Sequence, residues 1–319
     1  MESPLLEVEN LRIYYKTASL PVRAVDGVSF SVKKREVLGV AGESGCGKST
    51  LASGLLRLII PPAYVAGGRV LYRGKDLYNM DDKELRQIRW KSIAFLPQSS
   101  MNALNPTMKI YNQISDVIKA HEGKKPDSDL KNQVISLLRS VALPSRISQE
   151  YPCNLSGGMK QRVVIAMGMS LNPELIIADE PTSALDVVVQ KGVLEFLTDL
   201  KEKEGSSLIL VSHDIAILAE VADRIAIIYA GKIMEIQEVM ELFDEPLHPY
   251  TQGLIDSVPS FSRKTIPRSI PGLPPDLRNP PAGCRFNPRC PKVMDICMKE
   301  EPKFNEIEPG KFVACHLYQ

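Results

Sequence analysis

A glycine-rich stretch follows the apolar run Val37–Ala41 and has the spacing of a phosphate-binding loop: Gly, four residues, Gly, Lys, and Ser or Thr. Its glycines let successive backbone N–H groups point inward, and a helix that begins near Ser49 would add the positive end of its dipole. Lys48 is expected to reach the β and γ phosphates of a nucleotide, and Ser49 to bind Mg²⁺. A glycine-rich turn that binds nothing is the alternative. The predicted nucleotide contacts are Gly42, Glu43, Ser44, Gly45, Cys46, Gly47, Lys48, Ser49 and Thr50.

Two adjacent carboxylates, Asp179 and Glu180, end a second apolar run, Leu175–Ala178. In a parallel sheet the C-terminal ends of the strands face the ligand crevice, so both acids are predicted to lie beside the phosphates. Asp179 suits Mg²⁺, because a hard cation prefers oxygen ligands. Glu180 is the better candidate to orient or deprotonate an attacking water. The alternative is an acidic strand end that only faces solvent.

Upstream of these acids, the stretch Asn154–Arg162 reads Asn-Leu-Ser-Gly-Gly-Met-Lys-Gln-Arg and leads into a helix predicted to start near Met159. A helix N-terminus can bind phosphate, although an ordinary helix cap is the alternative. The stretch resembles the signature motif of ATP-binding-cassette (ABC) ATPases. In that family the signature of one subunit covers the nucleotide of its partner, so the resemblance implies that a dimer completes each site. The residues expected at the partner's nucleotide are Leu155, Ser156, Gly157, Gly158 and Gln161.

Further residues match functional positions of the ABC family. Gln98 resembles the glutamine that senses Mg²⁺ and the membrane partner, and His213 resembles the switch histidine that contacts the γ-phosphate. The resemblance therefore implies that Gln98 joins Ser49 and Asp179 in binding Mg²⁺, and that Glu180, His213 and Gln98 act in catalysis.

Two more positions match less directly. Ser183 and Asp186 fit the segment that crosses the dimer interface in this family. Tyr15 aligns with the aromatic residue on which adenine stacks. Tyr14 is the alternative for that role, because adjacent strand residues face opposite sides, and a plain core tyrosine is also open.

Four of the six cysteines gather near the C-terminus, after a proline-rich stretch. This tail resembles the C-terminal extension of oligopeptide and dipeptide importer ATPases. The spacing leaves no close chelating pair of the kind typical of zinc sites, and four thiolates around a [4Fe–4S] cluster fit better. Zinc, with His316 as a spare ligand, and disulfides or free thiols are the alternatives. The predicted cluster ligands are Cys284, Cys290, Cys297 and Cys315.

The elements that must position these groups follow from the hydrophobic pattern. Short antiparallel strands are expected before the loop and at Arg69–Tyr72, and Asp81 with Glu84 predicts a capping box. From Gln98 to Met169 the period becomes helical, and the exposed residues of this insertion are expected to be apolar, because it would dock a membrane subunit. Strands and helices then alternate, as parallel strands with helical crossovers require. The predicted elements are Leu175–Ala178, Val187–Lys203, Ser207–Val211, Ile215–Val221, Arg224–Tyr229, Lys232–Ile236, Glu238–Phe243 and His248–Ser257.

The expected fold class is α/β: a phosphate-loop ABC ATPase with a RecA-like core, an antiparallel β subdomain and a helical subdomain at about residues 99–170. The nucleotide-binding domain is expected to span residues 1–258, and a proline-rich linker with a small cysteine-rich C-terminal module residues 259–319. A chain of 319 residues with 44% apolar residues can build such a core.

Net charge and hydropathy narrow the class further. The net charge is +1, from 39 basic and 38 acidic residues, so a nucleic-acid partner is not expected. No membrane span or signal peptide is visible in the sequence, which predicts a cytosolic chain.

The sequence therefore predicts the ATP-hydrolysing subunit of a membrane importer for dipeptides or oligopeptides, with ATP, Mg²⁺ and the cluster as cofactors. Expected partners are a second ATPase subunit (a paralogue or a second copy), two permease subunits and an extracytoplasmic substrate-binding protein, with the chain on the cytoplasmic face of the membrane. Oligosaccharide or nickel import is an alternative, and so is a soluble ABC ATPase acting on ribosomes or DNA. A cassette that binds ATP without hydrolysis would lack Glu180 or His213, and both are present.

Overall fold

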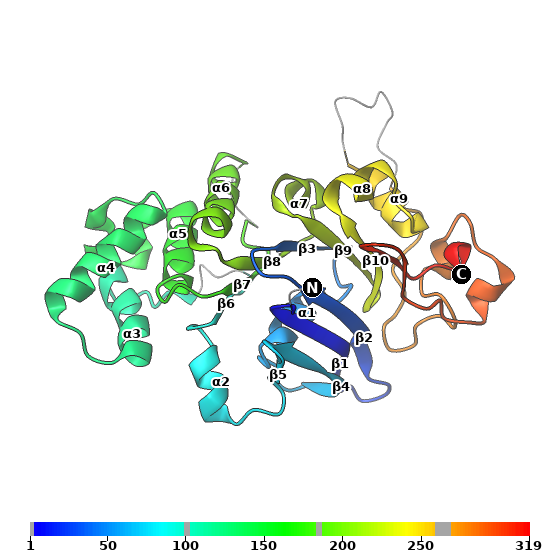
Figure 1. The fold of residues 1–319 in the computed structure, drawn as a ribbon, viewed down its shortest axis with the longest axis horizontal. Helices are drawn as coiled ribbons and strands as arrows, with labels where there is room; N and C mark the ends of the chain where they lie inside the picture. The colour runs from blue at the N-terminus through cyan, green and yellow to red at the C-terminus, as the bar shows by residue number, and fades with distance from the viewer. Residues whose placement is uncertain (1–2, 99–102, 183–186, 259–268) are drawn as a thin grey trace. The chain divides into compact units, whose positions relative to one another are not determined.

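A computed structural model describes residues 3–98, 103–182, 187–258 and 269–319 of the chain (Figure 1). The chain divides into two compact units. Unit 1 comprises Met1–Asn79 and Leu210–Gln319, and unit 2 comprises Met80–Ile209. Each unit buries apolar side chains of its own, such as Leu38 and Ile227 in unit 1 and Val134 and Ile177 in unit 2.

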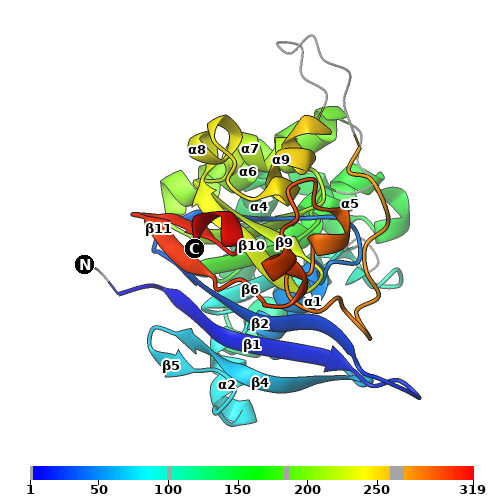
Figure 2. The same ribbon diagram turned by 90° about the vertical axis from the view of Figure 1, so that its right-hand side faces the viewer.

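Unit 1 contains an antiparallel sheet of four strands in the order β2-β1-β4-β5, which Figure 2 shows as one layer. Apolar residues alternate along β1, and Leu6, Val8, Leu11 and Ile13 are buried. The predicted antiparallel strands before the loop are confirmed. The strands are β1 (Leu6–Tyr15), β2 (Val22–Val32), β4 (Ala63–Tyr72) and β5 (Lys75–Asp76).

The other strands of unit 1 follow the order β11-β12-β10-β9-β3. β3 and β9 are parallel, whereas β9, β10, β12 and β11 pair antiparallel in succession. Every residue of β3 is buried, as expected for a strand covered on both faces. The strands are β3 (Val37–Ala41), β9 (Arg224–Tyr229), β10 (Lys232–Glu238), β11 (Asn305–Glu308) and β12 (Lys311–Val313).

Among the described helices of unit 1, two begin where the sequence supplies a capping side chain or a proline. Asp214 caps α7 by accepting a hydrogen bond from the Ala216 N–H at 2.9 Å, and Pro249 is the first residue of α9. The C-terminal segment, residues 269–319, is built mainly of turns and short 3₁₀ helices, and its Ala314 N–H bonds the Met234 carbonyl of β10 at 2.8 Å. The helices are α1 (Lys48–Leu55), α7 (Ile215–Val221), α8 (Val239–Asp244) and α9 (Pro249–Asp256).

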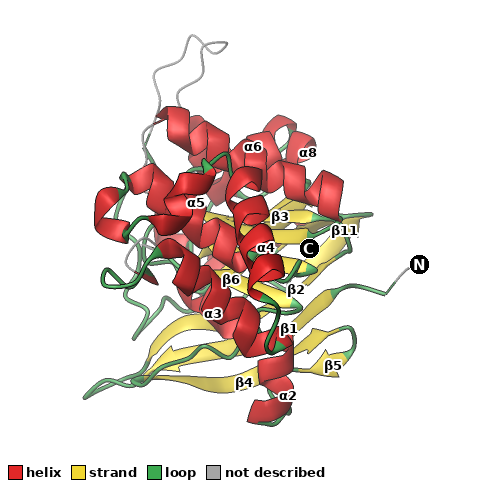
Figure 3. Ribbon diagram, turned by 90° about the vertical axis from the view of Figure 1, so that its left-hand side faces the viewer, coloured by secondary structure: helices red, strands yellow, loops and turns green. Residues whose placement is uncertain are grey.

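Unit 2 is mostly helical, and Figure 3 shows α3, α4 and α5 among its helices. The predicted capping box is present at α2: Asp81 accepts from the Glu84 N–H at 2.8 Å, and Glu84 accepts from the Asp81 N–H at 3.1 Å. Strands β6 and β7 pair in parallel, and β8 (Ser207–Ser212) crosses the boundary between the units. The other elements are α2 (Asp82–Ile88), β6 (Ile93–Leu96), α3 (Ile110–Glu122), α4 (Asp127–Ser140), α5 (Gly157–Gly168), β7 (Leu175–Asp179) and α6 (Val187–Glu204).

The surface of this helical region differs from the expectation. Within residues 103–170, the exposed large apolar side chain is Tyr151, while polar residues such as Asp116, Lys119 and Lys131 are exposed. The prediction of an apolar exposed face was therefore wrong for these residues, because most of the apolar side chains of the region are buried in the core of unit 2. Across the described ranges, no helix combines the length and apolar character needed to cross a membrane.

Candidate nucleotide-binding site

The glycine-rich stretch forms the predicted strand, loop and helix. β3 ends at Ala41 and α1 begins at Lys48. Only glycine fits at two points of the loop, because a Cβ on Gly42 would lie 2.1 Å from the Ile228 carbonyl oxygen and one on Gly47 would lie 1.9 Å from the Ala24 carbonyl oxygen. Gly47 stands at the N-cap of α1 and supplies no side-chain hydrogen bond, so the first N–H groups of the helix are left to the loop and its ligands.

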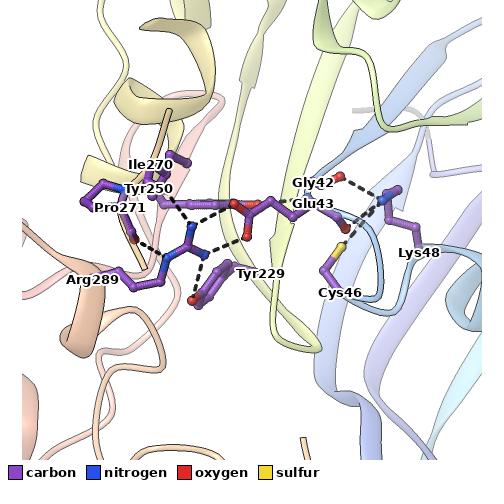
Figure 4. A network of polar contacts seen from close by, with 9 residues as sticks. All are labelled: Gly42, Glu43, Cys46, Lys48, Tyr229, Tyr250, Ile270, Pro271 and Arg289. Carbon is purple, nitrogen blue, oxygen red and sulfur yellow. Dashed lines mark hydrogen bonds and ion pairs between the residues drawn. The ribbon is translucent and has the colours of Figure 1, made fainter. Parts of the chain in front are cut away.

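Lys48 is buried and turned into this loop. Its ammonium donates to the carbonyl oxygens of Gly42 at 2.7 Å and Glu43 at 3.0 Å, and its Nζ lies 3.7 Å from the Cys46 Sγ (Figure 4). Burial raises the pKa of Cys46, so the thiol stays protonated despite the nearby ammonium. The lysine charge is thus held among the backbone groups where the sequence places the phosphates.

The structure separates the two candidate tyrosines. Tyr15 lies beside the loop, with its hydroxyl 2.9 Å from the Thr50 Oγ1. Tyr14 donates to Asp26 at 2.6 Å and meets the Tyr64 ring edge-on at 6.1 Å. Burial and the bond to Asp26 raise the pKa of Tyr14 to about 12. The Tyr14 hydroxyl is therefore bonded to Asp26 and the Tyr15 hydroxyl to Thr50 of α1, and the choice of Tyr15 for adenine stays a prediction.

Glu43 of the loop is bound by a residue that the sequence reasoning missed. Arg289, in the C-terminal segment, forms two parallel hydrogen bonds with the Glu43 carboxylate, at 2.7 and 2.9 Å. The Glu43 N–H also donates to the Tyr250 hydroxyl at 2.9 Å. An arginine in the cysteine-containing stretch gives no sequence signal of a partner 246 residues away.

The acidic groups at the end of β7 lie in unit 2. Asp179 is buried, and Glu180 is half-buried with a backbone φ of 47°, a conformation uncommon for a residue other than glycine. Gln98 donates from its Nε2 to the Glu180 Oε2 at 3.0 Å, so two of the three predicted catalytic residues are in contact. His213 belongs to unit 1 and is exposed just after β8, while Ser183 and Asp186 lie outside the described residues.

The signature stretch caps α5. Ser156 is the N-cap residue and accepts from the Met159 N–H at 3.4 Å, so the helix starts at Gly157, slightly before the predicted point. Ser156 and Gly157 are exposed, while Leu155 and Gln161 are buried. Ser156 and its glycines are the signature residues that a molecule outside this chain can reach.

The four C-terminal cysteines have free thiols, as have Cys46 and Cys153. Burial, together with the charges of Cys297, Cys315 and Cys290, raises the pKa of Cys284 to about 12. Among the described residues no group of three or more His, Cys, Asp or Glu side chains is arranged to hold a metal ion. The iron–sulfur cluster therefore stays a prediction.

Taken by its elements, this is a phosphate-loop nucleotide-binding protein: a buried parallel strand, a glycine-lined loop with an inward lysine, and a helix with an uncapped N-terminus.

Comparisons with known proteins narrow this class. A family model for "ABC transporter" matches residues 25–183, and one for "Oligopeptide/dipeptide transporter, C-terminal region" matches residues 234–297. The dipeptide transport ATP-binding protein DppD of Caldanaerobacter subterraneus subsp. tengcongensis is 44% identical over 99% of this chain and 98% of its own length. The oligopeptide transport ATP-binding protein OppD of Bacillus subtilis is 44% identical over 98% of this chain and 88% of its own. The dimeric ATP-binding cassette MJ0796 bound to ADP and phosphate superposes with a TM-score of 0.67 at 28% identity, over 73% of this chain and 98% of that one.

The chain belongs to the ABC transporter family, as an ATP-binding subunit of the oligopeptide/dipeptide transporter type. Its activity is ATP hydrolysis coupled to transport.

Proposed function

We propose that this chain binds ATP and Mg²⁺ at the loop of residues 42–50 and hydrolyses ATP to drive the import of dipeptides or oligopeptides. The observation that carries the proposal is the loop itself, in which Lys48 is turned inward to the Gly42 carbonyl oxygen and only glycine fits at positions 42 and 47. The peptide substrate is supported by the names of the relatives that match nearly the whole chain, which also makes oligosaccharide or nickel import less favoured.

Each predicted residue has a role in that reaction. Lys48 neutralises charge on the β and γ phosphates, and Glu180 orients the attacking water and accepts its proton. Gln98, bonded to Glu180 at 3.0 Å, holds that carboxylate, and His213 contacts the γ-phosphate. The described side chains fit Mg²⁺ by chemistry, because Ser49, Gln98 and Asp179 offer oxygen ligands, and the ion would offset charge on the leaving phosphate.

A second ATP-binding subunit completes the site, either a second copy of the chain or a paralogue. Its Ser156 and adjoining glycines, exposed at the N-terminus of α5, cover the nucleotide held by the loop of the first. ATP drives closure because it binds the closed pair better than the open one, and only such a difference in affinity shifts the equilibrium. The transporter is completed by two permease subunits, which dock the region of residues 99–170 at the cytoplasmic face, and by an extracytoplasmic binding protein.

The test of the ATPase mechanism is the substitution Glu180→Gln. We expect phosphate release to fall on the order of a hundredfold or more, since the general base is lost, while ATP affinity stays at the wild-type value. Glu195→Gln is the matched control, because Glu195 is an exposed residue of α6 paired with Lys191 at 4.0 Å, and its turnover should be unchanged. Undiminished hydrolysis in Glu180→Gln would sink the assignment of Glu180.

We also propose that Cys284, Cys290, Cys297 and Cys315 hold a [4Fe–4S] cluster. Support comes from the sequence, which places four cysteines within 32 residues, and from the burial of three of them, Cys284, Cys297 and Cys315. The group would fix the fold of the C-terminal segment around it.

Purification without oxygen tests the cluster. We expect a brown protein with iron and sulfide near about four per chain. Cys290→Ser should lower the iron content, whereas Cys153→Ser, at an exposed cysteine elsewhere, should not. If the protein purified without oxygen is colourless and carries zinc, the four cysteines form a zinc site and the cluster assignment is wrong.

A further inference from the structure

Arg289 uses its whole guanidinium group in one buried junction. A guanidinium has five N–H donors, and the structure gives it five acceptors, which Figure 4 shows converging on this side chain. Two bonds go to the Glu43 carboxylate, at 2.7 and 2.9 Å, and the rest go to Pro271, Ile270 and the Tyr229 hydroxyl, at 2.8, 3.3 and 3.3 Å. The Arg289 side chain is 4% exposed. Such a two-pronged pair fixes the position of the carboxylate as well as its charge.

Glu43 in turn holds the phosphate loop from within. Its carbonyl oxygen accepts from the Lys48 ammonium at 3.0 Å and from the Cys46 N–H at 3.3 Å. Its own N–H donates to the Tyr250 hydroxyl at 2.9 Å. A displacement of the Glu43 side chain would therefore also shift Lys48 and the loop backbone, because both are bonded to Glu43.

Aromatic side chains pack behind the pair formed by Arg289 and Glu43. Tyr229 and Tyr250 have ring centroids 4.6 Å apart, and Phe286 of the C-terminal segment lies 5.3 Å from each of them. All three are 1% exposed or less. Phe286 precedes Arg289 within the same turn of chain, so the arginine is presented to Glu43 from a rigid surface.

A second connection leads from the C-terminal segment to the other side of the loop. Arg285 bonds the Ala230 carbonyl and the Asp26 carboxylate. Gly231, which follows Ala230 in the chain, donates from its N–H to the Cys46 carbonyl oxygen at 2.8 Å. Arg285 and Arg289 adjoin Cys284 and Cys290 in the chain, so the loop is braced on both sides by the segment that carries the cysteines.

We infer that Arg289 is a positioning residue of the nucleotide site: it acts through Glu43, so that ATP affinity depends on the C-terminal segment. Arg289 does two things for the loop. It fixes the side chain of Glu43, whose backbone groups bond Lys48 and Tyr250, and it neutralises a carboxylate that would otherwise repel the phosphates of ATP. Arg289 acts on Glu43 of the loop that holds the nucleotide, so it governs binding of ATP and not the rate of the chemical step.

The experiment measures Mg-ATP affinity and turnover separately in the purified full-length chain. Arg289→Gln should raise the dissociation constant of ATP about tenfold, because it leaves the part-buried carboxylate of Glu43 unpaired. The turnover rate at saturating ATP should change less than about twofold. Arg278→Gln is the matched control: this arginine of the same segment pairs only with Asp276 at the surface, and its substitution should leave the affinity unchanged.

The double variant Arg289→Gln with Glu43→Gln separates positioning from mere stability. Removing the unpaired carboxylate should recover several-fold of the lost affinity, whereas two independent structural defects would add. If Arg289→Gln does not fold, Arg289→Lys replaces it, because lysine keeps the charge but cannot form both bonds. Wild-type affinity in the Arg289 variant, or a double variant that binds more weakly than the single one, overturns the inference.

The inference rests on the proposed ATP site at the loop, and Lys48→Ala tests that site by itself. If Lys48→Ala loses ATP binding and the Arg289 variant does not, the positioning role alone is wrong. If Lys48→Ala binds ATP as the wild type does, the proposed site is wrong, and the inference falls with it.

Discussion

At the scale of single residues, the sequence identified groups whose neighbours along the chain define their chemistry. Lys48 and Asp179 were recognisable because a strand and a loop of fixed spacing precede or follow them. Arg35 has a φ of 60°, a left-handed backbone angle that glycine adopts more readily, and its residue type gave no sign of it. Arg289 was not recognisable, since its partner Glu43 comes near only through the fold.

His248, which the sequence marked as the start of the last helix, allows a prediction about how stability depends on pH. His248 is the N-cap of α9, and its Nδ1 accepts from the Tyr250 N–H at 3.0 Å. Burial lowers the pKa of His248 to about 3, so the folded chain keeps it neutral. Its surroundings include Glu235, which accepts from the His248 N–H at 2.8 Å and whose own pKa burial raises.

Between about pH 6.5 and 4 the unfolded chain protonates this histidine and the folded chain does not, so stability falls as the pH is lowered through that window. We expect His248→Asn, which keeps an N-cap acceptor, to reduce the slope of unfolding free energy against pH by about 1.4 kcal/mol per pH unit at most. Denaturant titrations at several pH values measure the slope. The titrations at pH 8, where His248 is neutral in both the folded and the unfolded chain, measure only the effect of the substitution on packing. Identical slopes in both proteins would refute the neutral buried histidine.

At the scale of elements, the alternating strands and helices after residue 170 were predicted well, because each is bounded by a local signal. α7 and β9 have the predicted bounds, and α6 and β8 extend one residue further. β4 was predicted too short, since Gly67 and Gly68 read as a turn. They lie inside the strand, where the pairing with β1 shifts register between Glu9 and Arg12 and a Cβ on Gly68 would meet the Asn10 carbonyl oxygen at 2.3 Å.

Elements without such local signals were missed. β11 and β12 are short strands of the C-terminal segment, for which the sequence predicted a small cysteine-rich module but no strands. β12 adds to β10 through pairs such as Ile236 with Phe312, and Phe304 stacks on Phe312 at 5.7 Å. Pairing between strands so far apart in sequence is decided by the surface that β10 leaves available, which a single sequence does not display.

At the scale of the whole molecule, the loop and the signature lie in different units of one chain, and the proposed site joins the loop of one subunit to the signature of another. A chain on its own should then bind ATP and hydrolyse it slowly. Turnover per subunit should rise with protein concentration as pairs form.

Two variants tested in a mixture decide between a site made by one chain and a site made by two. Ser156→Arg, at an exposed position, should keep wild-type ATP affinity but lose turnover, because its own loop is intact and its signature is blocked. Lys48→Ala should lose ATP binding. If two copies of this chain form the pair, mixing the variants should restore about a quarter of the wild-type rate, since half of the randomly formed dimers then hold one intact site of two. Failure to recover, combined with turnover that does not depend on concentration, would contradict a site shared between two copies.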